Sequence, residues 1–256
     1  MVTLPDLAEQ ISVQLRTVRF GRPLQVHAVA TSTNDLARDL ASGGAGEGAA
    51  VLALEQSRGR GRLGRVWASP PGGLYLSVVL RPAFSPARWP LIGVACSLGA
   101  AAAAEAHARA PVRLKWPNDL LLDGGKVGGI LVEAGGDAAV CGIGLNVLLP
   151  SGSGMGPEGA TWLAVRNPDV SLNSLAPDVL FEFECRYVKL GVDPGALLAE
   201  WRARAVTLGR TVHVEVAEPF DGVAEDIDTD GALLVRTASG IRRVLAGDVV
   251  MSDGRR

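Results

Sequence analysis

The sequence predicts an α+β fold, in which a mixed or antiparallel sheet carries helices on one face and a small β-barrel follows. Between residues 112 and 149, apolar strand-like runs succeed one another too closely for a sheet of strictly alternating strands and helices. Residues 87–110 form a long alanine-rich segment that is typical of a core helix. Beyond Gly209, helical spacing gives way to short β-type runs, so we expect two domains, 1–208 and 209–256.

The individual elements follow from the hydrophobic period and from the positions of glycine and proline. In the first domain we expect strands at 25–30, 49–56, 74–80, 112–116, 120–122, 127–134 and 138–149. After an irregular opening helix, further helices are expected at 34–41, 175–190 and 194–206. The second domain should contain strands at 211–216, 220–226, 232–236 and 241–245, arranged as a small closed barrel. Residues 151–159 are rich in Gly, Ser and Pro and predict a mobile loop.

Composition excludes several classes of protein. The net charge of −2 and the pI near 6.0 do not fit a protein that coats nucleic acid, so any basic site must be local. Cys96, Cys141 and Cys185 are odd in number and far apart in apolar surroundings, which favours reduced thiols in an intracellular core. The chain shows neither a signal core nor a long uninterrupted apolar run. We therefore expect a soluble cytoplasmic protein with no membrane partner.

The densest chemical signal is an arginine–glycine loop within residues 56–67. It carries Arg58, Arg60, Arg62 and Arg65 among glycines, a combination suited to binding an anion through guanidinium groups and backbone N–H groups. The glycine spacing formally matches the dinucleotide fingerprint, but that motif needs a helix, which the following Trp-Ala-Ser-Pro-Pro run does not permit. A short segment that grips RNA nonspecifically, or a merely solvated loop, would show the same arginines and glycines.

Two further segments carry polar residues at strand ends. Lys115 and Lys126, two of only three lysines, flank an Asn-Asp pair, and two glycines follow Lys126. Lysine is costly to bury without an anion, although an ordinary polar hairpin would show the same pattern. A strand ending in Asn146 and the later Trp162 could read a base edge and cover a ring, but ordinary packing explains such residues more often.

Taken together and in order, these segments resemble the biotin protein ligases, in the monofunctional type without an N-terminal DNA-binding domain. The matching motifs span about residues 25 to 250 and are Thr-Ser-Thr-Asn at 31–34, Gln56 with the loop to Pro70, Gly-Leu-Tyr-Leu-Ser at 73–77, Lys-Trp-Pro-Asn-Asp at 115–119, residues 126–133 and residues 142–146. The resemblance implies a catalytic domain like those of class II synthetases and biotin–lipoate ligases, followed by an SH3-like domain.

The resemblance implies a two-step reaction. Biotin and Mg-ATP would form biotinyl-5′-AMP, and a lysine of a biotin carboxyl carrier protein domain, from acetyl-CoA carboxylase or a related enzyme, would then attack it. The catalytic residues implied are Arg62, Lys126 and Asp119. The biotin-binding residues implied are Ser32, Thr33, Asn34, Gln56, Arg60, Gly61, Arg62, Lys126, Gly128 and Gly129. The residues implied for ATP and the adenylate are Arg60, Arg62, Arg65, Trp67, Lys115, Asn118, Lys126, Asn146 and Trp162. No metal ligand is assigned.

Two departures from the family pattern qualify this expectation. Leu63 stands where some members carry another arginine, which weakens the charge of the loop. Only about 25 residues precede the first matching strand, too few for the winged helix of bifunctional members, so we expect no DNA binding. A homodimer is compatible with the resemblance. Two rival functions fit the same scaffold: a lipoate ligase or transferase, whose substrate would not need the Ser-Thr-Asn-Gln set, and a noncatalytic biotin-binding protein.

Overall fold

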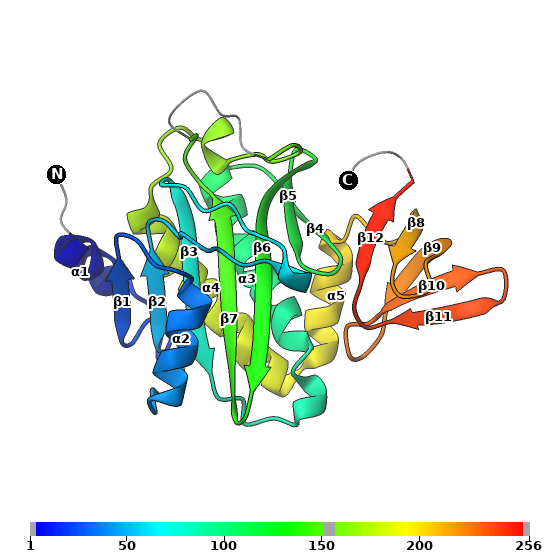
Figure 1. Ribbon diagram of the computed structural model, residues 1–256, viewed down its shortest axis with the longest axis horizontal. Coiled ribbons are helices and arrows are strands. Elements are labelled where there is room, and N and C mark those ends of the chain that lie inside the picture. The colour runs from blue at the N-terminus through cyan, green and yellow to red at the C-terminus, as the bar shows by residue number, and fades with distance from the viewer. Residues whose placement is uncertain (1–3, 151–156, 253–256) are drawn as a thin grey trace.

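The computed structural model describes residues 4–150 and 157–252 and confirms the α+β fold class (Figure 1). Seven strands form the first sheet: β1 (Leu24–His27), β2 (Ala50–Ala53), β3 (Gly73–Leu80), β4 (Val112–Lys115), β5 (Asp119–Leu122), β6 (Gly125–Gly135) and β7 (Ala138–Asn146). Their order is β1-β2-β3-β7-β6-β5-β4, with β1 and β2 parallel and every other neighbouring pair antiparallel. The sheet is therefore mixed, as expected.

Helices cover both faces of this sheet, whereas the sequence analysis expected them on one. The main layer consists of α1 (Leu4–Gln14), α3 (Leu91–Ala108), α4 (Leu172–Val192) and α5 (Pro194–Arg204). Helix α2 (Thr33–Ser42) lies on the opposite face, in front of β2 and β3 in Figure 1. Alternating side chains explain this, because Cys141 of β7 joins the main core while Val140 packs in a separate cluster beneath α2. Strand β3, which lies between the two layers, is buried at every position.

Helix α3 is the central helix of the main layer. It begins at Leu91, later than predicted, because a 3₁₀ turn, η2 (Pro86–Arg88), and Pro90 precede it. Its length and composition alone would let it cross a membrane, but 67% of it is buried inside the protein, and it packs against α4. It is thus the core helix that the alanine-rich segment predicts. The cysteines of α3 and β7, Cys96 and Cys141, are buried free thiols, whereas Cys185 is exposed, contrary to expectation.

The C-terminal domain is an antiparallel sheet of five strands. They are β8 (Thr211–Glu215), β9 (Phe220–Ile227), β10 (Leu233–Thr237), β11 (Gly240–Val244) and β12 (Asp248–Met251), in the order β11-β10-β9-β8-β12. The sequence analysis missed β12, and no pairing joins β11 to β12 in the described part of the chain to close a barrel. The domain boundary at residue 208 stays a prediction. Of the predicted mobile loop 151–159, residues 151–156 lie outside the described residues.

Candidate active site

A cavity of about 440 Å³ opens where the arginine–glycine loop, the ends of β4 to β7 and the C-terminal domain meet. Fourteen of the residues singled out in the sequence line it: Ser32, Thr33, Asn34, Gln56, Arg60, Gly61, Arg62, Arg65, Trp67, Lys115, Asn118, Asp119, Lys126 and Gly129. Residues far apart in the sequence thus converge on one space. The lining holds five cationic side chains and three carboxylates, so the cavity favours an anionic ligand.

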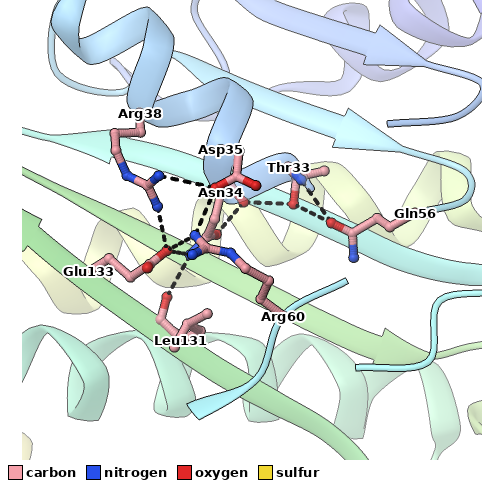
Figure 2. Close-up of polar contacts among 9 residues, drawn as sticks. Thr33, Asn34, Asp35, Arg38, Gln56, Arg60, Leu131 and Glu133 are labelled. Atoms are coloured by element: carbon pink, nitrogen blue, oxygen red, sulfur yellow. Dashed lines mark hydrogen bonds and ion pairs between the residues drawn. The ribbon is translucent and has the colours of Figure 1, made fainter. Parts of the chain in front are cut away.

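One end of the cavity has a polar floor at the start of α2 (Figure 2). The Thr33 backbone N–H donates to Gln56 Oε1 at 2.8 Å, and Gln56 Nε2 donates to Ser69 Oγ at 2.8 Å. Ser77 Oγ lies 2.8 Å from Thr33 Oγ1 and 2.7 Å from Asn34 Oδ1. Because these side chains hold one another in place, the floor offers donors and acceptors in fixed positions for a polar ring.

Glycines allow the close approaches that this floor requires. A Cβ at Gly142 would lie 2.1 Å from Asn34 Oδ1, so a side chain on β7 would displace that amide. A Cβ at Gly144 would lie 2.7 Å from the Trp67 indole nitrogen, which is buried without a hydrogen-bond partner. The indole therefore lies directly on the backbone of β7, with the Lys126 ammonium 5.3 Å from its ring centroid.

The arginine–glycine loop folds as a small hairpin over the cavity. The backbone N–H of Trp67 donates to the Gly59 carbonyl at 2.9 Å, and the backbone N–H of Gly61 donates to the Arg65 carbonyl at 2.7 Å. A single 3₁₀ turn, η1 (Arg62–Gly64), forms its tip, which excludes the helix that a dinucleotide fingerprint needs. The Arg65 guanidinium pairs with Asp248 at the start of β12, so the loop is linked to the C-terminal domain.

Cations without ion-pair partners gather at the other end of the cavity. In the described part of the chain, Arg62 and Lys115 form no salt bridge, and the closest polar partner of Arg62 is Asn118 Oδ1 at 3.4 Å. Burial lowers the pKa of Arg62 and the pKa of Lys115, although nearby carboxylates, including Asp119, oppose both shifts. Half-buried cations of this kind are stabilised by an anionic ligand.

Lys126 and Asp119 form a close ion pair beside these cations. Lys126 Nζ lies 2.6 Å from Asp119 Oδ1, with side-chain exposures of 38% and 22%. The backbone of Lys126 is anchored by hydrogen bonds from its N–H to the Gly159 carbonyl, at 2.7 Å, and from Thr161 N–H to its carbonyl, at 2.9 Å. A cation and a carboxylate are therefore placed together where the two ends of the cavity meet.

Three of the residues that the family resemblance assigns to ligand binding lie outside the cavity lining: Gly128, Asn146 and Trp162. Gly128 packs on its neighbouring strand, where a Cβ would lie 2.5 Å from Leu145 Cδ2. The Asn146 amide donates to the carbonyls of Lys126 and Thr161 at 3.2 and 3.1 Å, so it tethers backbone. Trp162 directly precedes the 3₁₀ turn η3 (Leu163–Val165). The structure thus does not bring these three residues into this cavity.

Sequence reasoning also missed residues of the site. The C-terminal domain contributes Glu215 and Asp248 to the lining, which an isolated strand pattern could not reveal. Glu133, on β6, accepts hydrogen bonds from Asn34 and Arg60. Glu133 ends the matching motif at 126–133, but the sequence analysis assigned it no role, although it is a charged residue within an apolar strand.

Comparison with known proteins places this architecture in a class. Residues 26–147 match the Biotin/lipoate A/B protein ligase family, and residues 207–252 match the Biotin protein ligase C terminal domain. The cavity lies between the two matched segments, and they define a two-domain protein ligase.

Individual relatives narrow the class further. Biotin--[acetyl-CoA-carboxylase] ligases of Mycobacterium tuberculosis and Paracoccus denitrificans are each 36% identical over 237 residues, covering 90% and 85% of this chain and 89% and 96% of the relatives. The Aquifex aeolicus biotin protein ligase, solved in complex with biotin and ATP, has a TM-score of 0.77 and 27% identity, over 89% of this chain and 97% of that one. The chain belongs to the biotin protein ligase family, and its activity is that of a biotin ligase.

Proposed function

We propose that the protein joins biotin to AMP at the expense of ATP and then transfers biotin to a lysine of a biotin carboxyl carrier protein domain. One observation carries this proposal: a single cavity of about 440 Å³ is lined both by the polar floor and by Arg62 and Lys115, which form no salt bridge within residues 4–150 and 157–252. The Aquifex aeolicus relative of the same fold holds biotin and ATP. A carboxylate substrate with a polar ring would use both ends of such a cavity.

The polar floor is the proposed site for the ureido ring of biotin. Ser32, Thr33, Asn34 and Gln56 supply donors and acceptors, with Arg60 and Gly61 from the loop. Gly129, where a Cβ would lie 3.2 Å from the Trp67 indole, lines the cavity and would border the apolar part of the ligand together with that indole. Gly128 lies outside the lining, and its proposed contact with biotin rests on the family resemblance. A dithiolane ring makes no ureido hydrogen bonds, so this floor favours biotin over lipoate.

The cationic end is the proposed site of adenylation. A carboxylate oxygen of biotin attacks the α-phosphorus of ATP, the bond from that phosphorus to the bridging oxygen breaks, and pyrophosphate leaves. Arg62 and Lys126 stabilise the negative charge that develops on the phosphoryl oxygens. Lys115 and Asn118 contact the phosphates, and Arg65 closes the loop over them.

Asp119 is the proposed residue for the transfer step. The acceptor lysine amine attacks the carbonyl carbon of the mixed anhydride, the bond from that carbon to the bridging phosphate oxygen breaks, and AMP leaves. The proton of the amine passes to Asp119, which lies at the cavity wall beside Lys126. Because Lys126 pairs with Asp119 at 2.6 Å, binding of the adenylate would draw Lys126 away and release the carboxylate for the amine.

The remaining assignments rest on the family resemblance. Asn146 and Trp162 are proposed to contact the adenine, although both lie outside the present cavity lining. Among residues 4–150 and 157–252, no three His, Cys, Asp or Glu side chains are grouped to hold a metal. Mg²⁺ is commonly bound through substrate phosphates and one or two carboxylates, which the cavity supplies in Asp119, Glu215 and Asp248. We propose that Mg²⁺ enters with ATP.

The proposed partners are the carrier domain of acetyl-CoA carboxylase or a related carboxylase, and the proposed compartment is the cytoplasm. We propose no DNA partner and no membrane partner, and a homodimer is compatible with the fold. The carrier is the protein substrate that the names of the relatives imply.

A transfer assay tests the proposed function directly. Purified protein is incubated with a carrier domain, ATP and either labelled biotin or labelled lipoate. We expect ATP-dependent labelling of one carrier lysine by biotin and none by lipoate. Labelling by lipoate alone would favour the lipoate ligase, and biotin binding in calorimetry without any transfer would favour a noncatalytic biotin-binding protein.

A further inference from the structure

Beside the polar floor lies a cluster of four charged side chains, which we call the Glu133 cluster (Figure 2). It consists of Glu133 on β6, Asp35 and Arg38 on α2, and Arg60 from the loop. A single oxygen, Glu133 Oε2, lies 2.6 Å from Arg60 Nη2, 3.1 Å from Arg38 Nη2 and 2.8 Å from Asn34 Nδ2. One carboxylate thus joins the helix, the sheet and the loop that together enclose the proposed biotin site.

The contact between Glu133 and Asn34 fixes the side chain of Asn34. Its Nδ2 donates to Glu133 at 2.8 Å and to the Leu131 carbonyl at 3.4 Å, while its Oδ1 lies 2.7 Å from Ser77 Oγ. An amide can rotate to exchange oxygen and nitrogen, and an acceptor-only carboxylate permits just one of the two orientations. Glu133, which is the closer of the two acceptors of Nδ2, therefore holds the Asn34 amide in one orientation.

The contact between Glu133 and Arg60 fixes the side chain of Arg60. The Arg60 guanidinium lies between Glu133, at 2.6 Å, and Asp35, at 2.9 Å. Within the cluster, the two negative charges of Glu133 and Asp35 balance the two positive charges of Arg38 and Arg60. Arg62, two residues along the same loop, has no salt bridge within residues 4–150 and 157–252. The two loop arginines therefore differ in kind. Arg62 is available to an incoming phosphate, whereas Arg60 is already neutralised and holds the loop against α2 and β6.

We propose that Glu133 is a positioning residue for biotin: it sets the orientation of the Asn34 amide and seats the loop through Arg60. This inference rests on the proposed function and adds a residue that acts on the biotin end of the reaction without touching the reacting atoms. Its effect should appear mainly in biotin binding, because its contacts hold Asn34 on the polar floor and Arg60 beside α2. Within the described residues, none of these contacts reaches Arg62 or Lys115 at the cationic end.

The test uses the full-length protein with steady-state adenylation measured by pyrophosphate release. Glu133→Ala should raise the KM for biotin about tenfold or more, because it removes the charged acceptor that holds both Asn34 and Arg60. The KM for ATP should change less than about twofold. Glu133→Gln keeps an acceptor of the same shape, so it should fold as the wild type does and restore part of the biotin affinity. A Gln variant with a KM for biotin as high as that of the Ala variant or higher would overturn the orientation argument.

Arg38→Ala is the matched control, because it removes a third donor from the same carboxylate and a partner from Asp35, but leaves the contacts of Glu133 with Asn34 and Arg60 in place. It should change the KM for biotin less than about twofold. Equal effects of Glu133→Ala and Arg38→Ala, or a parallel rise in the KM for both substrates, would indicate a merely structural cluster and overturn the proposal.

A double-mutant cycle with Arg60→Ala isolates the loop contact. If Glu133 acts partly through Arg60, Glu133→Ala should raise the KM for biotin by a smaller factor in the Arg60→Ala background than in the wild type. Equal factors would overturn the role of the loop. If the wild type transfers biotin and the Glu133→Ala variant has the same KM for biotin, this inference alone is refuted. If the wild type does not transfer biotin, the proposed function is refuted.

Discussion

The Lys126 ammonium lies 2.6 Å from the Asp119 carboxylate and 5.3 Å from the centroid of the Trp67 ring. These three residues come from β6, β5 and the arginine–glycine loop, and all three line the cavity. The contacts place a cation, a proton acceptor and an apolar wall at the point where the polar floor meets the cationic end. A carboxylic acid bound with its ring on the floor would present its carboxylate here.

Lys126→Ala should suppress adenylate formation while leaving the fold intact. Loss of one preorganised group that stabilises developing charge commonly costs about 10²–10³ in rate. The measurement is the rate of biotin-dependent pyrophosphate release. Lys189→Ala is the matched control, because Lys189 on α4 lies 3.8 Å from Glu200 and does not line the cavity. An unchanged rate in the Lys126 variant would exclude its proposed role.

Arg62→Gly should loosen retention of the adenylate. Without the one loop guanidinium that lines the cavity and lacks an ion pair in the described structure, biotinyl-5′-AMP should leave the cavity faster and label lysines of unrelated proteins. Biotin incorporated into a bystander protein, such as serum albumin, measures the escape and should rise about tenfold or more, in line with the worth of a charge-assisted hydrogen bond. Arg58→Gly is the control, since Arg58 belongs to the same loop but lies outside the cavity lining. Equal labelling by the two variants would contradict the prediction.

Gly144→Ala should weaken biotin binding through Trp67. A Cβ at Gly144 would lie 2.7 Å from the indole nitrogen, so the indole must leave the backbone of β7. Overpacking of this kind typically costs about 1–3 kcal/mol, which corresponds to roughly 5- to 150-fold in the dissociation constant measured by calorimetry. Gly93→Ala on α3 is the control, because its Cβ would meet only Val132 Cγ2, at 3.8 Å. If both variants bind biotin as the wild type does, the indole does not border the biotin site.

Much of the first domain could be predicted from local pattern, and the places where prediction failed have physical causes. The run 74–80 predicts β3 almost residue for residue, because eight consecutive buried positions leave little ambiguity. The position of α2 could not be predicted, since strands buried on both faces give no sign of which helix covers which face. β12 (Asp248–Met251), which pairs with β8, was missed because its sequence, Asp-Val-Val-Met, does not alternate between apolar and polar residues.

In the candidate site, too, some features could be predicted from the sequence and others could not. Motif chemistry located the loop and both lysines, because glycine, arginine and lysine in those patterns indicate an anion. It could not reveal that Asp248 pairs with Arg65, since that contact depends on how the C-terminal sheet docks. Nor could it separate Arg60 from Arg62, which look alike in sequence but differ in their ion pairs.

Lys115 should make ATP binding depend on pH. Burial is the main cause that lowers its pKa, and Lys126 lowers it further, whereas Asp119, Asp248 and Glu215 oppose the shift. Between this lowered pKa and the usual value for lysine, the unfolded chain holds a proton that the folded chain has released. Burial of Lys115 therefore lowers the free energy of unfolding at pH values below this range, which we call the Lys115 window. The free energy of unfolding rises as the pH rises through the window.

Bound phosphates reverse the preference, because they stabilise the ammonium and raise the pKa of Lys115 again. Below the window Lys115 is charged with or without ATP, so the KM for ATP should be flat. Above the lowered pKa, ATP binding must take up a proton, and the KM should rise by at most about tenfold per pH unit. Lys115→Arg keeps its charge and should abolish the rise, whereas Lys189→Arg on the surface of α4 should keep it. Profiles of KM for ATP against pH that coincide in the Lys115→Arg variant and the wild type would show that another group binds the proton.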